Sequence, residues 1–166
     1  FLTEAPRSSG RKGGLSSILV STLAILAVTL TVALPLGFAA AVWLSEFTKP
    51  GGKFARFVRV SLDVLAGVPS IVFGLFGSAF FCDFLGLGFS ILSGGLTLAC
   101  MVLPILIRST EAGLSSAPEG WRQGAAALGL SKSAALWQIL LPAAAPSIGA
   151  GLMLGMGRAM AETAAL

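Results

Sequence analysis

The stretch "GGLSSILVSTLAILAVTLTVALPLGFAAAVWLS", residues 13–45, is a run of 33 residues without a charged side chain. A helix needs about 20 mostly apolar residues to cross the hydrocarbon core of a bilayer. Three more charge-free runs follow, at residues 64–82, 84–107 and 133–157. None of these runs alternates apolar and polar residues with a period of two, which favours membrane helices over a β-barrel. We therefore predict an all-α, polytopic transmembrane helix bundle with about four spans, at residues 15–44, 62–82, 94–108 and 135–160.

The composition also indicates that a bilayer is the solvent of this fold. The 166 residues are 55% hydrophobic and 11% charged, whereas soluble domains carry roughly 25% charged residues. The net charge of +4 does not indicate a nucleic-acid partner, because the basic residues lie in short segments between apolar runs. The chain has no histidine, which excludes a histidine-based metal site, and we predict no metal site. Prolines interrupt every run and are expected to kink the helices; they are Pro35, Pro69, Pro104, Pro142 and Pro146.

The distribution of lysine and arginine predicts the orientation in the membrane. Seven basic residues lie in the loop 45–61 and the segment 108–134, namely Lys49, Lys53, Arg56, Arg59, Arg108, Arg122 and Lys132. The other side has three, Arg7, Arg11 and Lys12, and the loop 83–93 has none. Cytoplasmic loops carry an excess of basic residues. We therefore predict that residues 109–134 form a cytoplasmic segment, whose length suggests that it has a function of its own.

Three ionisable residues close the apolar runs and are candidates for contact with an anion. Arg108 ends the third run, and Arg158 and Glu162 end the fourth. The last two are four residues apart and therefore share one face of a helix. A guanidinium can donate two hydrogen bonds to an oxyanion, and charges within spans tend to be functional. We predict that these three residues line an anion pathway; the alternative is that the arginines mark span ends and reach lipid headgroups.

The segment "RQGAAALGLSKSAALWQILLP", residues 122–142, lies between the third and fourth spans. Pro118 and Glu119 suit the start of a short helix, and Gly129 suits its end. The segment resembles the "EAA" coupling loop of binding-protein-dependent ABC importer permeases, in which Glu-Ala-Ala is followed by three residues, Gly, nine residues and Ile-x-Leu-Pro. The corresponding residues here are Gln123, Gly124, Ala125, Gly129, Ile139, Leu141 and Pro142.

The spacing of this pattern matches throughout, and two identities differ. Gln123 replaces the glutamate of the family, and Gly124 replaces its first alanine. The resemblance implies that these residues dock a separate ATPase subunit. It does not imply a charge contact at Gln123, which carries no charge.

Four further stretches are similar to the A-type permease subunit of the phosphate-specific transport system, namely "FLTEAP", "LAGVPSIVFGLFG", "LTLACMVLPILIRSTEAGL" and "GRAMAETAAL". Ala161 replaces a glycine that is usual in that family. The resemblance implies a type I ABC importer permease fold, a multi-pass protein of the inner (plasma) membrane, and translocation of inorganic phosphate. The implied partners are a second permease subunit, two ATPase subunits and an external phosphate-binding protein. We expect residues 1–166 to be a fragment of one transmembrane permease domain.

No enzyme is predicted, because no pair of a nucleophile and a base stands out. In "GAAALGLSKS" the glycines have the spacing of a phosphate-binding loop, but Leu130 stands where that loop needs lysine. We therefore expect no bound cofactor, with ATP and magnesium used by the partner ATPase. Other readings are an importer for another oxyanion or an amino acid, an ion-coupled secondary transporter or channel, and a non-transporting membrane scaffold or sensor. Internal repeats would support the secondary transporter, and none is found.

Overall fold

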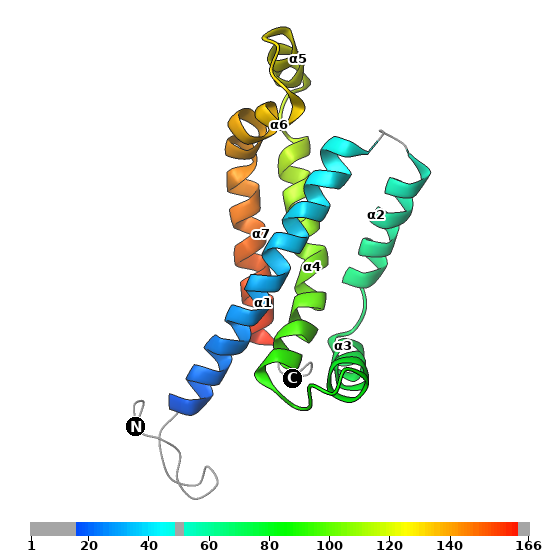
Figure 1. Ribbon diagram of the computed structural model, residues 1–166, viewed down its shortest axis with the longest axis vertical. Helices are drawn as coiled ribbons and strands as arrows, with labels where there is room; N and C mark the ends of the chain where they lie inside the picture. Colours follow the sequence, from blue (N-terminus) through cyan, green and yellow to red (C-terminus); the bar gives the residue numbers. More distant parts are fainter. Residues whose placement is uncertain (1–15, 49–51, 163–166) are drawn as a thin grey trace, which may run out of the picture.

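The computed structural model describes residues 16–48 and 52–162, and every element in these ranges is a helix (Figure 1). The helices are α1 (Ser16–Val42), the π-helix η1 (Trp43–Phe47), α2 (Lys53–Ala66), α3 (Ser70–Gly77), the π-helix η2 (Ser78–Phe84), α4 (Ile91–Ser115), α5 (Glu119–Ala127), α6 (Lys132–Ala135), the π-helix η3 (Leu136–Leu140) and α7 (Leu141–Ala161). The predicted all-α bundle is confirmed. The predicted start of the first span at residue 15 lies outside the described residues, as do Arg7, Arg11, Lys12 and Lys49.

Within the described ranges, three continuous helical segments are long and apolar enough to cross a membrane, at Ile18–Phe47, Ile91–Ser115 and Lys132–Ala161. The first joins α1 to η1, and the third joins α6, η3 and α7. The second is α4, which continues past the predicted end at residue 108. The predicted end rested on the charge of Arg108. In the structure Arg108 and Glu111 are paired with charges of the protein, so neither residue marks the end of the helix.

The predicted helix 62–82 is wrong as a single helix. Helices α2 and α3–η2 pass the same length and composition test only as a pair that is bent by 99°. The break comprises Gly67, Val68 and Pro69. Proline has no N–H to donate and disfavours the α conformation in the residue before it, and Pro69 itself has extended backbone, with a ψ of 140°. The second predicted span is therefore a bent pair of helices.

Helix α4 is the centre of the bundle, with α1 and α7 packed along it (Figure 1). Its side chains Leu98 and Val102 lie in a buried cluster with Ala33 of α1 and Ala159 of α7. A hydrogen bond adds direction to this packing, because the Thr29 hydroxyl of α1 donates to the Gly95 carbonyl of α4 at 3.1 Å. The central position explains why α4 buries polar as well as apolar side chains.

The contact between α4 and α7 depends on a close approach of their backbones. A side chain at Gly151 of α7 would overlap Ser109 of α4. One turn away, the Ser147 hydroxyl donates to the Ser109 carbonyl at 2.9 Å. Small residues let membrane helices pack at this separation, which fixes the antiparallel register of the two helices.

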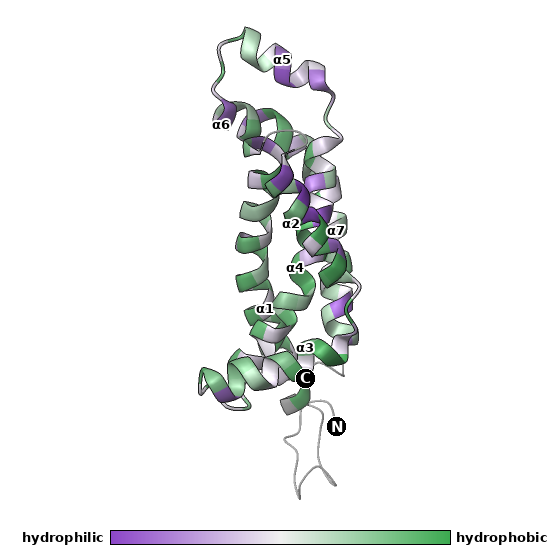
Figure 2. Cartoon of the chain, turned by 90° about the vertical axis from the view of Figure 1, so that its right-hand side faces the viewer, coloured by the Kyte–Doolittle hydropathy of each residue, from purple (hydrophilic) through white to green (hydrophobic). Residues whose placement is uncertain are grey.

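The segments predicted to share one side of the membrane lie at the same end of the bundle. Helix α5, the end of the first helical segment and the start of α2 are at one end, and α3 and the start of α4 are at the other (Figure 1). Figure 2 shows that α1 is hydrophobic along most of its length, whereas hydrophilic residues gather on α5 and along α2. That the end with α5 faces the cytoplasm stays a prediction.

Candidate functional site

The predicted short helix between the third and fourth spans is α5. Pro118 precedes it with extended backbone, at a ψ of 138°. Gly129 ends it with a φ of +73°, in the left-handed region that favours glycine. Two hydrogen bonds close this end, from the Gly129 N–H to the Ala126 carbonyl and from the Leu130 N–H to the Ala125 carbonyl, each at 3.0 Å. This pair of bonds is a Schellman motif, so α5 has a defined length although it stands apart from the bundle.

The residues that match the coupling-loop pattern lie on α5, in the turn that follows it (Gly129), in η3 (Ile139) and in α7. Gln123 and Gly124 are exposed on α5, and Ala125 is buried. Leu141 and Pro142 are the first two residues of α7 and directly follow the π-helix η3 within the continuous helical segment Lys132–Ala161. The structure thus presents the front half of the pattern on the short helix α5 and places the back half inside the third continuous helical segment. The predicted role of these residues in ATPase docking stays a prediction.

Two large apolar side chains are exposed on or beside α5. Trp121 is 47% exposed and Leu128 is 80% exposed. Apolar side chains gathered at a polar end of a protein are typical of an interaction surface. Leu128 was missed from the sequence, because a leucine beside a helix-ending glycine is equally typical of a buried contact.

Arg122 fastens α5 to the bundle. Its Nη2 donates to Glu46 Oε1 at 2.7 Å and to the Leu114 carbonyl at 2.9 Å, and its Nη1 donates to the Ala117 carbonyl at 3.3 Å. Glu46 belongs to η1, and Leu114 belongs to the last turns of α4. From the sequence, Arg122 was counted only as a loop charge. Its role was missed because Glu46 is 76 residues away along the chain.

A cavity separates α5 from the ends of the spans. It has a volume of about 800 Å³, and its lining includes Glu46, Arg122, Ala125, Leu130 and Lys132. The cavity places water-accessible space between the helix and the bundle. The guanidinium of Arg122 is therefore one of the few groups that connect the two.

Four charged residues join α2 to α4. Arg59 Nε donates to Glu111 Oε1 at 2.5 Å, and Arg108 Nη1 donates to Glu111 Oε2 at 3.3 Å. Arg108 Nε also donates to Asp63 Oδ1 at 2.9 Å. Two arginines and two carboxylates give no net charge, which lets Glu111 be buried. Arg108 therefore lies within α4, and not at its end, with its guanidinium between two carboxylates.

Arg158 and Glu162 lie near the other end of α7. Arg158 is exposed in the last turn of the helix. Glu162 is the first residue after the helix and has extended backbone, with a ψ of 113°. Because α7 ends at Ala161, Glu162 does not share a helix face with Arg158 as expected. Among the described residues, no ion pair joins the Arg158 and Glu162 side chains.

The structure does not bring Arg108 and Arg158 together. Residue 151 of α7 lies against Ser109 of α4. Arg158 is seven residues further along α7, which is roughly 10 Å along the helix axis. Glu162 instead lines a separate cavity with Thr22 and other residues of α1. An anion pathway through all three predicted residues would have to extend along the bundle, and this pathway stays a prediction.

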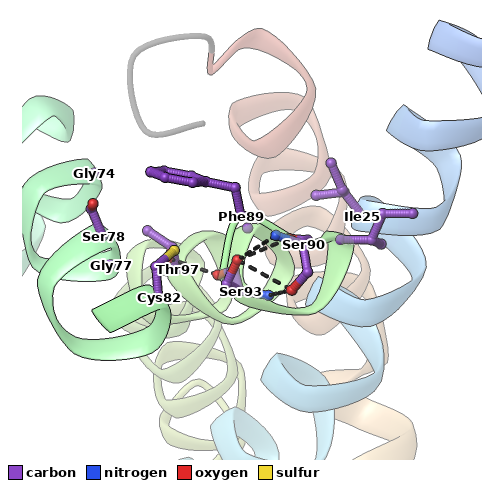
Figure 3. A pocket seen from close by; sticks show the side chains of 11 residues that line it. Ile25, Gly74, Gly77, Ser78, Cys82, Phe89, Ser90, Ser93 and Thr97 are labelled. Atoms are coloured by element: carbon purple, nitrogen blue, oxygen red, sulfur yellow. Dashed lines mark hydrogen bonds between the residues drawn. The ribbon is translucent and has the colours of Figure 1, made fainter. Parts of the chain in front are cut away.

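Hydroxyl groups of Ser78, Ser90, Ser93 and Thr97 line a small cavity (Figure 3). The cavity lies at the start of α4, which is at the end opposite α5 (Figure 1). Ser90 caps α4, because its Oγ accepts a hydrogen bond from the Ser93 N–H at 3.2 Å. The Ser93 Oγ in turn accepts from the Ser90 N–H at 3.1 Å. These reciprocal bonds form a capping box, which satisfies two N–H groups at the start of the helix. The described side chains that line this cavity include no arginine or lysine, so it offers an anion no counter-charge.

Within residues 16–48 and 52–162, no three His, Cys, Asp or Glu side chains gather closely enough to hold a metal ion. Cys82 and Cys100 are free thiols.

Comparison with known proteins gives one family and a set of relatives. The family described as "Binding-protein-dependent transport system inner membrane component" matches residues 33–166. The "Probable ABC transporter permease protein YqgI" of Bacillus subtilis is 35% identical over the whole chain and 56% of the relative. The "Phosphate transport system permease protein PstA 2" of Mycobacterium tuberculosis is 34% identical over 96% of the chain and 52% of the relative. The "Phosphate transport system permease protein PstA" of Xylella fastidiosa is 35% identical over 94% of the chain and 54% of the relative. The chain thus spans about half the length of these curated relatives.

Proposed function

Because this chain belongs to the family of binding-protein-dependent transport system inner membrane components, we propose that it is part of the permease of an ATP-driven importer of inorganic phosphate. Family membership and the apolar helices make it a multi-pass protein of the inner membrane. The substrate is proposed from the relatives that are named as phosphate transport system permeases. An importer of another oxyanion or of an amino acid is the alternative.

The observation that carries the proposal is the free helix α5. Helix α5 carries the first residues of the coupling-loop pattern and stands outside the bundle (Figure 1). It exposes Gln123, Gly124 and Trp121. A helix with small side chains and one exposed aromatic ring can enter a groove on another protein. We propose that this partner is the ATPase subunit, and that the intact importer has two ATPase subunits, a second permease subunit and an external phosphate-binding protein.

For the anion pathway we propose Arg108, Arg158 and Glu162. The exposed Arg158 is free of the two carboxylates that hold Arg108. Arg108 becomes available to an oxyanion when its bond to Asp63 opens, and this carboxylate is the accessible one of its two partners, with 60% of the side chain exposed. An oxyanion can accept the same paired hydrogen bonds that a carboxylate accepts.

The test is uptake of labelled phosphate into proteoliposomes. They would contain the full-length protein, the second permease subunit and the ATPase, with the binding protein outside and ATP inside or absent. We expect ATP-dependent uptake that excess sulfate does not block. Uptake that persists without ATP under a membrane potential would instead support a secondary transporter. ATP hydrolysis without phosphate uptake would still be consistent with an ATP-driven importer, but it would refute phosphate as the substrate.

Arg158→Gln then tests the pathway in the same vesicles. We expect it to abolish phosphate uptake, whereas the exposed Arg56 of α2, changed to Gln, removes the same charge and is expected to leave uptake unchanged. Unchanged uptake with Arg158→Gln would contradict the proposed role.

A further inference from the structure

We infer that Arg122 is a positioning residue that transmits movement of α5 to the ends of α1 and α4. The inference rests on the proposed function, because it assigns the movement to a partner ATPase. It adds a specific mechanical connection: one guanidinium joins the docking helix to two different spans.

The first observation is how little else holds α5. Ala125 is its buried residue, whereas Trp121, Gln123 and Gly124 are exposed. The cavity of about 800 Å³ lies between α5 and the spans. Without a side-chain connection, α5 could tilt on its two flanking chain segments while the spans remained where they are.

The second observation is where the guanidinium binds. Its contact at the Leu114 carbonyl lies on a residue with no exposed surface, in a buried cluster with Leu136, Leu140 and Ala144. This cluster joins the last turns of α4 to η3 and α7. Movement of Arg122 is therefore passed to a packed core, and not to a flexible loop.

The third observation is the carboxylate at the end of α1. Glu46 lies in η1, and its side chain is 15% exposed. Ser45 Oγ donates a second hydrogen bond to the same oxygen, at 3.1 Å. Because the Glu46 carboxylate is partly buried and accepts two hydrogen bonds, salt screens its ion pair with Arg122 less than it screens a surface pair.

The chemistry requires arginine. A planar guanidinium presents five donors in a fixed fork, and here it reaches one carboxylate and two carbonyls at once. A lysine ammonium is a compact charge that cannot span the same three acceptors. Arg122→Lys should therefore keep the charge and lose much of the connection.

The experiment measures two rates in the reconstituted full-length importer: ATP hydrolysis and uptake of labelled phosphate. The variants are Arg122→Gln, Arg122→Lys, Glu46→Gln and the double variant Arg122→Gln/Glu46→Gln. Arg56→Gln is the matched control for loss of one exposed positive charge at the same end.

We expect Arg122→Gln and Glu46→Gln to lower the phosphate imported per ATP by roughly 2- to 30-fold, the range found for residues that couple distant sites. Hydrolysis should change far less. The double variant should be no worse than Arg122→Gln, because both changes break the same link. An unchanged ratio, an equal loss of hydrolysis and uptake, or additive losses in the double variant would each overturn the inference.

A second measurement does not depend on the substrate. Spin labels at Gly120→Cys on α5 and Phe47→Cys in η1, both exposed positions, report the distance between the two elements after replacement of Cys82 and Cys100 by Ser. We expect one narrow distance distribution, which Arg122→Gln broadens and Arg56→Gln does not. An equally narrow distribution with Arg122→Gln would overturn the inference. If wild-type vesicles import no phosphate but the broadening occurs, the proposed substrate fails and the connection stands.

Discussion

Replacing Glu111 by glutamine tests whether the charges between α2 and α4 hold these helices together. The substitution keeps the shape of the side chain and removes its charge. Glutamine has one acceptor oxygen where the carboxylate has two, so Arg59 and Arg108 would share one acceptor. Arg108 would keep Asp63, and Arg59 would keep the Leu44 carbonyl at 3.2 Å. A fully buried charge that loses its partner costs about 3–5 kcal/mol.

The actual cost is smaller, because both guanidinium groups reach water. The side chain of Glu111 is 9% exposed, and those of Arg59 and Arg108 are 33% and 35% exposed. We therefore estimate a loss near that of one charged hydrogen bond, about 2 kcal/mol. Asp63→Asn removes an exposed carboxylate from the same network, and we expect a loss of only about 0–1 kcal/mol.

Thermal unfolding of the full-length protein in detergent provides the measurement. For a chain of this size 1 kcal/mol corresponds to about 2–4 °C in Tm. We thus expect Glu111→Gln to lower Tm by about 4–8 °C, and Asp63→Asn to lower it far less. High salt should leave the larger effect almost unchanged, because buried pairs are weakly screened. Equal effects of the two variants, or a larger effect of Asp63→Asn, would refute the reasoning.

Four other substitutions probe local features. Gly151→Ala places a methyl group against Ser109, and we expect a loss of about 1–3 kcal/mol in thermal unfolding; Gly149→Ala, in open space on the same helix, should stabilise by up to about 1 kcal/mol. Ser90→Ala removes the cap of α4, and a loss of about 0.5–2 kcal/mol should appear as faster hydrogen exchange in its first turn. Gly129→Ala forces a side chain into a left-handed conformation at a cost of about 1–2 kcal/mol, and exchange should accelerate at the end of α5 while the Tm of the bundle stays the same.

Length and the absence of charge were enough to predict the continuous spans, since a bilayer admits few alternatives. The same signal failed at residues 62–82, where the run is apolar but the helix is broken. The proline in each apolar run predicted a kink there. However, Pro35 and Pro104 lie inside unbroken helices, whereas Pro69 lies at the break between α2 and α3. Which prolines end a helix depends on the packing of neighbouring helices, and a single sequence does not contain that information.

The candidate site divides in the same way. The ends of α5 follow from local chemistry, so Pro118 and Gly129 predicted them correctly. Asp63, which binds Arg108, and Glu46, which binds Arg122, are 45 and 76 residues away from them along the chain. No rule of spacing connects positions that far apart. Arg108 was therefore identified as a special charge and its neighbour Glu111 has a helical spacing that a sequence can show, whereas Asp63 became visible only in the folded bundle.

The network between α2 and α4 also bears on how the chain is made. Helix α4 carries Arg108 and Glu111 within a segment that must enter the bilayer, and α2 with Arg59 leaves the ribosome earlier. The first positive partner for Glu111 outside α4 is thus already present when α4 emerges. We expect the membrane integration of α4 to be less efficient in a nascent chain whose Arg59 is replaced by glutamine, because the carboxylate then reaches the translocon with only Arg108 to neutralise it.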